Sequence, residues 1–465
     1  MGIFDDSFSI MGSMARGTAA ATVWTGNMIY TALQNAKTKR EVKQIYYNAS
    51  NTNFQNRAVA IMPGLSKQHL MLVSNEPSDN DVYDYQTKSS TAALDYIWGV
   101  TTTPNSMIVS GGQICDRVNA LVPFVHKAQS ENIPVVVLHN NDDSITEMIL
   151  SHSICFESVS RKGCFYDAFR GLPVDDIAFL LFETMDKDLA TPTAESLLRA
   201  LIEILLITEG KITFQNLASF PLISLKKKID EIKNKGFLSG DEYQEITHYY
   251  MAGSQNTDAV RIFLDRLNRQ ATSVYGNCGS NPSNIKKILN QNGVIAIDVG
   301  NTGNELITTF IINYLILLHS QGKRFMVVVD GIPIAKYIKL KDLLNGTTYA
   351  ISNADFVSSL YGGEIKGDEL FSEITGNVDT IVLFRHASGT SCQKWSDHFG
   401  KYKKIRIRYN IGQNNAFMNS SNSRGISVDE TDEPRIRGET ISKLSNGIAC
   451  IQNIDGILIA DINYS

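Results

Sequence analysis

The chain has 465 residues, with 43 basic and 48 acidic side chains and a formal net charge of -5. An ordinary apolar content of 43% and this small net charge exclude a disordered chain, and 33 glycines and 11 prolines exclude collagen-like and low-complexity classes. The mild acidity also argues against a protein that coats nucleic acid with bulk positive charge.

The N-terminal region has no basic segment before an apolar one, so we expect no secretory signal. The stretch Gly17–Ala36 is the closest to a membrane span, but seven Thr, Asn and Gln residues interrupt it. We therefore expect a packing helix there and no membrane span. The six cysteines contain no C-x-x-C pair, which predicts no metal site and no disulfide framework and fits a reducing compartment.

The first half of the chain alternates strand and helix patterns. Two short strands are expected at Arg57–Pro63 and His69–Asn75, before a polar loop. A strand at Ser106–Gly112, a helix through Val118 and Val125, and a strand at Ile133–Asn140 then form a parallel β/α unit.

A helical period replaces this pattern from about Ala190 to Ala271. The β/α pattern resumes at Gly293–Val299, continues with a helix at Glu305–Ser320, and reaches a strongly apolar strand at Phe325–Asp330. Further strands are predicted at Thr347–Ser352, Thr380–Arg385 and Lys404–Tyr409, and in a terminal hairpin of Gly447–Gln452 and Gly456–Asn463.

The sequence thus predicts an α/β fold whose mostly parallel sheet is split by an all-helical insertion. The expected divisions are a helical extension (1–50), the first part of the α/β domain (51–185), the insertion (186–285), and the second part with its C-terminal hairpin (286–465).

This order of elements resembles the soluble part of conjugative type IV coupling proteins, the TraG/TraD class of RecA-like P-loop ATPases. The segment IVSGGQICDRV (Ile108–Val118) stands where that family has its phosphate-binding loop, and FMVVVDGIP (Phe325–Pro333) stands at its Walker B strand. The segments TYAISNADFVSSLYGG (Thr348–Gly363) and Gly376–Lys401 are similar to its sensor segment and the stretch that follows. The resemblance covers about residues 90 to 465 and implies a RecA-like fold.

Three residues depart from the chemistry that this resemblance implies. A P-loop binds phosphates through G-x-x-x-x-G-K-[ST], but here Asp116 stands approximately at the lysine position. Gly331 replaces the Walker B glutamate, and Ser352 replaces the sensor glutamine. Because each lost role contributes orders of magnitude in rate, we predict no catalytic residues and no bound cofactor, and expect the chain not to be an enzyme.

What remains of a nucleotide site is a vestigial set. It comprises Ser110, Gly111, Gly112, Arg117 and Asp330. The turn Ser110–Gly112 keeps a weak anion-binding capacity through its backbone N–H groups. Asp330 has the simpler interpretation of a strand-end residue before an Asp-Gly turn.

Two further sets of basic residues are candidates for binding. Strand periodicity places Lys404, Arg406 and Arg408 on one face, as phosphate or DNA contacts; protection of an edge strand by charge explains them equally well. Arg435 and Arg437 are candidates to act on the nucleotide of a neighbouring subunit.

Three functions follow from this interpretation. The first is a degenerate pseudo-ATPase that acts as a structural or adaptor component, or recruits substrates, in a DNA-transfer or secretion machine. The second is an ATP-driven DNA translocase, using ATP and Mg²⁺, whose site a neighbouring subunit completes. The third is a DNA-binding protein without ATPase activity. We expect a cytoplasmic chain, peripheral to a membrane-bound complex, whose partners are protein subunits, further copies of itself, or nucleic acid.

Overall fold

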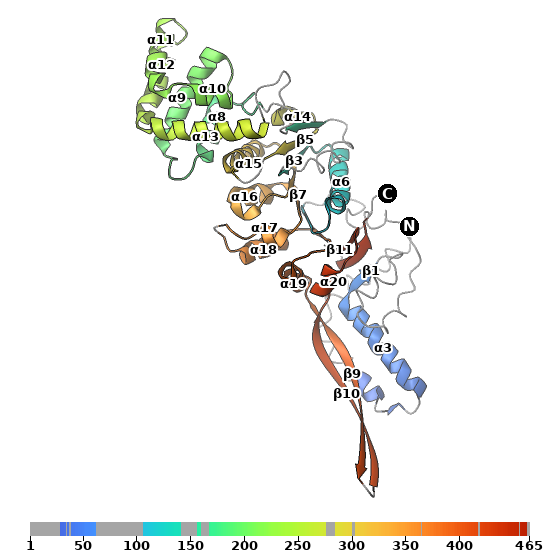
Figure 1. Cartoon of the computed structure of the whole chain (residues 1–465). Helices are drawn as coiled ribbons and strands as arrows, with labels where there is room; N and C mark the ends of the chain where they lie inside the picture. Colours follow the sequence, from blue (N-terminus) through green and yellow to red (C-terminus); the bar gives the residue numbers. More distant parts are fainter. Residues whose placement is uncertain are drawn as a thin grey trace. The chain divides into compact units, whose positions relative to one another are not determined.

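The computed structural model describes residues 28–33, 35–36, 39–61, 106–140, 156–159, 167–275, 284–299, 303–363, 365–416, 419–454 and 456–462 (Figure 1). The strand expected at His69–Asn75 lies outside these ranges. The chain forms two compact units. Unit 1 comprises Met1–Ala120, Asn353–Ser358 and Glu373–Ser465, and unit 2 comprises Leu121–Ser352 and Ser359–Ser372.

Among the described residues, unit 1 contributes five strands to the large sheet, in the order β1-β12-β11-β8-β2. Their bounds are β1 Val59–Ile61, β2 Ser106–Ser110, β8 Thr380–Leu383, β11 Ile448–Asn453 and β12 Gly456–Asp461. β2 runs parallel to β8 and β1 runs parallel to β12, whereas β11 is antiparallel to both of its neighbours. The predicted C-terminal hairpin of β11 and β12 is confirmed, and Gly456 adopts the positive φ of 139° in its turn.

Unit 2 contains a fully parallel set in the order β7-β6-β3-β5-β4. The strands are β3 Val135–His139, β4 Phe156–Val159, β5 Val294–Asp298, β6 Met326–Asp330 and β7 Thr348–Asn353. β3, β5 and β6 are buried along their whole length, as their continuous β-branched and apolar sequences predict. β4 was not predicted, because its four residues are too few to display a period.

An all-helical insertion separates β4 from β5. It consists of α8 Val174–Thr184, α9 Pro192–Glu209, α10 Phe214–Ser219, α11 Leu225–Asn234, α12 Gly240–Gly253 and α13 Thr257–Tyr275. The central helix α9 begins where the Thr191 hydroxyl accepts a hydrogen bond from the Ala194 N–H, and it ends at Gly210 in the left-handed conformation. α12 packs tightly on α9 at Gly253. A Cβ at this position would lie only 2.5 Å from the Thr193 carbonyl oxygen, so the close approach requires glycine. The chain therefore has an α/β fold whose mostly parallel strands are split by an all-helical insertion.

The remaining helices accompany the strands. In chain order they are α3 Lys39–Arg57, α6 Ile114–Ser130, α14 Ile285–Asn290, α15 Glu305–Ser320, α16 Ile338–Gly346, α17 Phe356–Ser359, α18 Gly367–Gly376, α19 Gly389–His398 and α20 Gly438–Ser442. α15 is buried on nearly all sides, in agreement with its almost continuous apolar sequence. Arg57 belongs to α3, so the strand expected from Arg57 begins only at Val59.

A long separate hairpin of β9 (Lys401–Ala416) and β10 (Asn419–Pro434) belongs to unit 1. The strand expected at Lys404–Tyr409 lies within β9, but β10 was not predicted. Helix α3 packs against the base of the hairpin through a small apolar cluster (Figure 1). The buried members of this cluster are Ile29, Leu33, Ile45, Ala49 and Ile405.

Helix α3 also satisfies the open backbone edge of β9. The Asn53 side-chain amide donates to the Ile405 carbonyl oxygen (2.9 Å) and its oxygen accepts from the Ile405 N–H (2.7 Å). Asn56 donates to the carbonyl oxygen of Lys403 at 3.2 Å. The side chain of Asn53 thus pairs with both backbone groups of Ile405, as a neighbouring strand would.

We expect Asn53→Ala to destabilise unit 1, because Ile405 is buried and would lose partners for its N–H and C=O groups. The expected loss in the free energy of unfolding is about 1–3 kcal/mol. Gln44→Ala is the matched control on the same helix, since the hydrogen bond of Gln44 to Asn48 is exposed. Urea unfolding of both variants measures the difference, and equal stabilities would contradict this role of Asn53.

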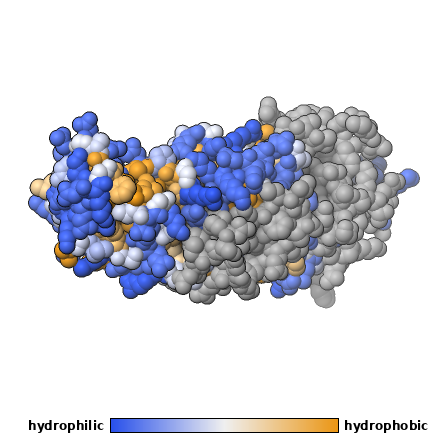
Figure 2. Space-filling view, turned by 90° about the horizontal axis from the view of Figure 1, so that it is seen from above, coloured by the Kyte–Doolittle hydropathy of each residue, from blue (hydrophilic) through white to orange (hydrophobic). Residues whose placement is uncertain are grey.

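Hydrophilic residues predominate on the coloured part of the surface in Figure 2, with smaller hydrophobic patches between them. In the insertion, the large exposed apolar side chains include Ile223, Phe237 and Met251. Single exposed apolar residues are ordinary on soluble surfaces and need no partner. Within the described ranges, no helix combines the length and apolar character needed to cross a membrane.

Candidate functional site

The turn between β2 and α6 occupies the place where the sequence resemblance implies a phosphate-binding loop. β2 ends at Ser110 and α6 begins at Ile114. Gly111 and Gly112 connect them with φ angles of 85° and 67°, which favour glycine. Strand, glycine turn and helix are therefore present, as in a P-loop.

The backbone N–H groups of this turn donate hydrogen bonds to carbonyl and carboxylate oxygens of the protein itself. The Gly111 N–H donates to the Asn353 carbonyl oxygen at 3.0 Å, and the Gly112 N–H donates to the Arg385 carbonyl oxygen at 2.8 Å. The N–H of Gln113 donates to the Asp116 carboxylate at 2.9 Å. A P-loop aims such N–H groups at phosphate oxygens.

The segment that follows β8 packs directly on the turn. A Cβ at Gly111 would lie 2.5 Å from the His386 ring, and one at Gly112 would lie 2.8 Å from the Cβ of Phe384. The two glycines therefore allow another part of the chain to approach closely, in the way that P-loop glycines allow a phosphate to approach.

A buried Ser-His pair holds this segment in place. Ser110 Oγ lies 2.9 Å from His386 Nε2, and the Phe356 N–H donates to Ser110 Oγ at 3.1 Å. His386 Nδ1 lies 2.9 Å from the Phe384 carbonyl oxygen, so Nδ1 carries the proton and Nε2 accepts from the serine. Burial lowers the pKa of His386, although the Phe384 carbonyl and Asp355 oppose this, and the ring is therefore neutral near pH 7. Because Ser110 is 0% exposed, this pair has a structural role and no access to substrate.

Asp116 and Arg117 complete the turn. Asp116 is 4% exposed, and its second carboxylate oxygen accepts from the Gly447 N–H at 3.0 Å, which ties α6 to the residue before β11. Arg117 is 6% exposed, and its Nη1 donates to the Gly112 carbonyl oxygen at 3.3 Å. The N–H groups of Gly111, Gly112 and Gln113 are already paired, and the buried carboxylate of Asp116 lies near the lysine position. The turn therefore does not fit a nucleoside triphosphate.

Asp330 lies in unit 2, at the end of β6. It is in register with His139 of β3 on one side and Ser352 of β7 on the other, and His139 is in register with Asp298 of β5. All four are at most 2% exposed. Gly331 follows with a φ of 65°, consistent with a strand-end Asp-Gly turn.

His139 and Asp298 were not singled out from the sequence. The available signal was that three apolar strands, β3, β5 and β6, each end in an ionisable residue. No group of three or more His, Cys, Asp or Glu side chains among the described residues is arranged to hold a metal ion.

The predicted basic face of β9 is neutralised by β10. Lys404 and Arg406 both contact the carboxylate of Glu433, and Arg408 lies 3.5 Å from Asp429. The side chain of Lys404 is only 7% exposed. Periodicity correctly placed the three basic residues in one strand, but it did not detect the acidic strand opposite them.

The two candidate arginines at the end of the hairpin also have partners within unit 1. Arg435 Nη1 donates to the Arg57 carbonyl oxygen at 2.6 Å, and burial lowers the pKa of Arg435. Arg437 donates to Glu433 at 2.5 Å. Neither arginine is poised as a free cation for a neighbouring subunit.

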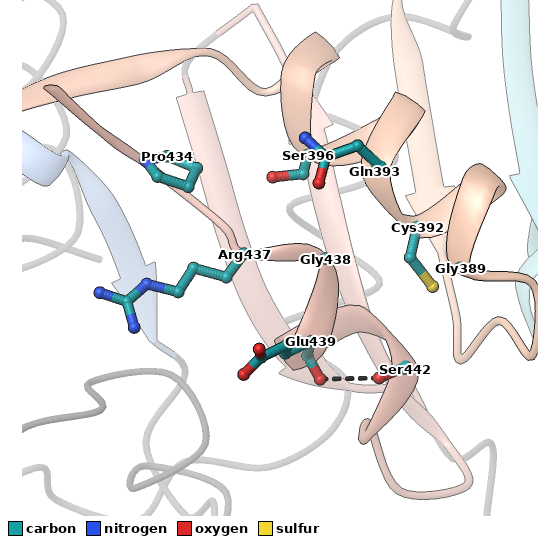
Figure 3. Close-up of a pocket in the computed structure, with 9 residues that line it drawn as sticks. All are labelled: Gly389, Cys392, Gln393, Ser396, Pro434, Arg437, Gly438, Glu439 and Ser442. Atoms are coloured by element: carbon teal, nitrogen blue, oxygen red, sulfur yellow. Dashed lines mark hydrogen bonds between the residues drawn. The ribbon is translucent and has the colours of Figure 1, made fainter.

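Arg437 lines a pocket of about 400 Å³ between α19 and α20 (Figure 3). It is the one cation among the nine described lining residues, and its side chain points away from α19. Ser396 and Ser442 donate to backbone carbonyl oxygens, at 2.7 and 2.9 Å respectively. The cation of this pocket is already paired with Glu433.

Comparison with known proteins identifies the fold. No family model and no curated protein matches the sequence. Among solved structures, the unbound bacterial conjugative coupling protein TrwBdeltaN70 matches with a TM-score of 0.52 and 12% identity, over 82% of this chain and 94% of the other. The plasmid coupling protein TrwB in complex with the non-hydrolysable GTP analogue GDPNP matches with a TM-score of 0.50 and 12% identity, over 81% and 93%. The chain therefore has a type IV coupling protein-like, RecA-like fold.

Proposed function

We propose that this chain is a degenerate coupling protein-like component of a type IV secretion-related or DNA-transfer machine, which acts through assembly or substrate recruitment and not through ATP hydrolysis. The fold provides the link to such machines. The observation that carries the proposal is the turn at Gly111 and Gly112, whose phosphate-binding donors pair with Asn353 and Arg385.

The paired N–H groups of the turn argue against nucleotide binding independently of the missing motif residues. A lost lysine alone removes one attractive charge, which other groups can replace. Here a bound triphosphate must also displace two carbonyl oxygens and the segment Phe384–His386, which the Ser110 hydrogen bond to His386 holds in place. Each displaced hydrogen bond costs about 0.5–1.5 kcal/mol, and each buried donor or acceptor left unpaired costs about 1–3 kcal/mol.

The alternatives receive less support from the same contacts. An ATPase completed by a neighbouring subunit needs an accessible arginine, whereas Arg435 and Arg437 bond within their own unit. A DNA-binding face at Lys404, Arg406 and Arg408 needs unpaired positive charge, whereas Glu433 and Asp429 neutralise it.

We expect no stabilisation of the protein by ATP, GTP or ADP with Mg²⁺. A ligand at 100 times its Kd would raise the free energy of unfolding by about 2.7 kcal/mol, so thermal unfolding with millimolar nucleotide is a sensitive test. Phosphate release should equal that of Asp330→Ala, the matched variant at the Walker B position. Turnover above background that Asp330→Ala abolishes would refute the proposal.

A cellular test addresses the role in a machine. In a host whose DNA transfer or secretion requires this chain, wild type and Asp330→Ala should complement a deletion equally. Loss of complementation by a folded Asp330→Ala protein would favour the ATPase alternative.

A further inference from the structure

A pocket of about 390 Å³ lies in the helical insertion, where the chain after α9 meets the segment before α8. Its apolar walls come from Phe169, Leu172, Ile177 and Ile212, which are at most 8% exposed, and from the partly buried Leu206 of α9. All of these residues belong to unit 2. The volume is that of a small-molecule site, for which roughly 300–1,000 Å³ is usual.

Three charged side chains also line this pocket, namely Asp167, Arg170 and Lys211. Burial raises the pKa of Asp167, although the charges of Arg170 and Lys211 and a hydrogen bond from the Arg170 backbone oppose the rise. The carboxylate is therefore partly withdrawn from water, with two cations near it. A charged group of a ligand is screened less at such a place than on an open surface.

The two cations of the pocket are not used by the fold. Basic residues elsewhere in the insertion, such as Arg199, Lys226 and Arg266, have a carboxylate oxygen at 3.0 Å or less. Among the described residues, the side chains of Arg170 and Lys211 have neither a hydrogen bond nor an ion pair of this kind. Both residues are exposed, so their charges remain accessible to a ligand.

Hydrogen bonds from neighbouring elements hold both charged walls in place. The side-chain amide of Asn284, the residue before α14, donates to the Asp167 carbonyl oxygen at 2.8 Å. On the other wall, the Asn216 amide of α10 donates to the Lys211 carbonyl oxygen at 2.7 Å. The pocket is thus formed before any ligand arrives, which lowers the cost of ordering it on binding.

We propose that this pocket binds a small zwitterionic amino acid with an apolar side chain. The carboxylate of the ligand pairs with Arg170 and Lys211, its ammonium group pairs with Asp167, and its side chain packs on Phe169 and Ile177. Other ligand classes match fewer of these groups. A metal cation is repelled by the two basic residues, and an inorganic anion leaves the apolar walls unused. A purely apolar molecule would cover the three charges without pairing them.

Calorimetric titration of the full chain with L-leucine and L-phenylalanine tests the proposal. We expect one saturable site for at least one of them at concentrations up to about 10 mM. For leucine, three analogues each remove one feature: 4-methylpentanoate lacks the ammonium group, 3-methylbutylamine lacks the carboxylate, and glycine lacks the side chain. Each should bind at least about tenfold more weakly, and matching analogues should behave likewise for phenylalanine. Absence of saturable binding by both amino acids, or equal binding of an analogue, would overturn the proposal.

Variants of the charged residues locate the binding site. Arg170→Gln combined with Lys211→Gln should weaken binding of the amino acid at least about tenfold. Asp167→Asn should remove the preference for the amino acid over its analogue without the ammonium group, which a purely structural role of Asp167 would not do. The control is Lys227→Gln, which removes an exposed charge of α11 outside the pocket.

Urea unfolding establishes that each variant is folded before its affinity is compared. Unchanged affinity in the folded Arg170 and Lys211 double variant, or an equal loss in the Lys227 control, would show that the amino acid does not bind in this pocket. These measurements do not depend on whether the protein binds nucleotide.

Discussion

Replacing Glu433 by glutamine should lower the free energy of unfolding by about 3–5 kcal/mol, the cost of breaking a buried ion pair by removing one partner. The side chain of Glu433 is 8% exposed and receives Arg406, Arg437 and the nearly buried Lys404. Without its carboxylate, the positive charge of Lys404 would remain in a site with little access to water. Urea unfolding of wild type and Glu433→Gln at neutral pH measures the loss.

The adjacent residue provides the matched control. Asp432 pairs with Lys403, but both side chains are about half exposed. Exposed pairs contribute about 0–1 kcal/mol, so Asp432→Asn should change stability little. Similar losses in the two variants would show that Glu433 is not the centre of this network.

The same carboxylate predicts a pH dependence. Burial raises the pKa of Glu433, but the hydrogen bonds from Arg437 and Arg406 and the charge of Lys404 outweigh it and hold the pKa below its usual range. A lowered folded pKa means that the stabilisation is present above the unfolded pKa of about 4.3 and is lost as the pH falls through the folded pKa. Unfolding of wild type between pH 3 and pH 7 should show this loss, and Glu433→Gln should show less of it.

Asp116→Ala should have the second large effect, a loss of about 2–5 kcal/mol. This carboxylate accepts the N–H groups of Gln113 and Gly447, and charge-assisted hydrogen bonds contribute about 1.5–3 kcal/mol each. Asp116→Asn keeps the shape and one oxygen acceptor, so its loss should be smaller. Thermal and urea unfolding compare the two variants.

A control for this prediction is Cys115→Ala, at the neighbouring exposed position of α6. It should change stability little. If Asp116→Ala were as stable as this control, the hydrogen bonds of the Asp116 carboxylate to Gln113 and Gly447 would not stabilise the fold.

The sequence predicted the strands of unit 2 well, because their apolar and β-branched runs are long and are bounded by polar residues. It predicted the helical insertion for a similar reason, since the buried residues of α9 recur with a helical period. It missed β4, which is short, and β10, whose charged residues lack apolar alternation. Aligning the basic residues Lys403–Arg408 with the acidic run Asp429–Glu433 could have revealed this strand, but only if a long hairpin had been considered.

The candidate site was less accessible to sequence reasoning. The departures at Asp116, Gly331 and Ser352 can be read from single positions, because each motif specifies a residue type. The contacts of the turn with Asn353, Arg385 and His386 depend on segments more than 200 residues away. No local pattern predicts which carbonyl oxygen will face an N–H group at that separation.

Unit 1 joins segments that lie far apart in the sequence, which has a consequence for synthesis on the ribosome. Strand β1 pairs with β12, and α3 packs on β9. Both early elements therefore need partners that are synthesised about 350 to 400 residues later. The insertion of unit 2 has mainly local helix contacts and can fold while the chain emerges. We therefore expect vectorial folding in which the insertion forms first, and in which α3 and β1 remain without these partners until β9 and β12 have been synthesised.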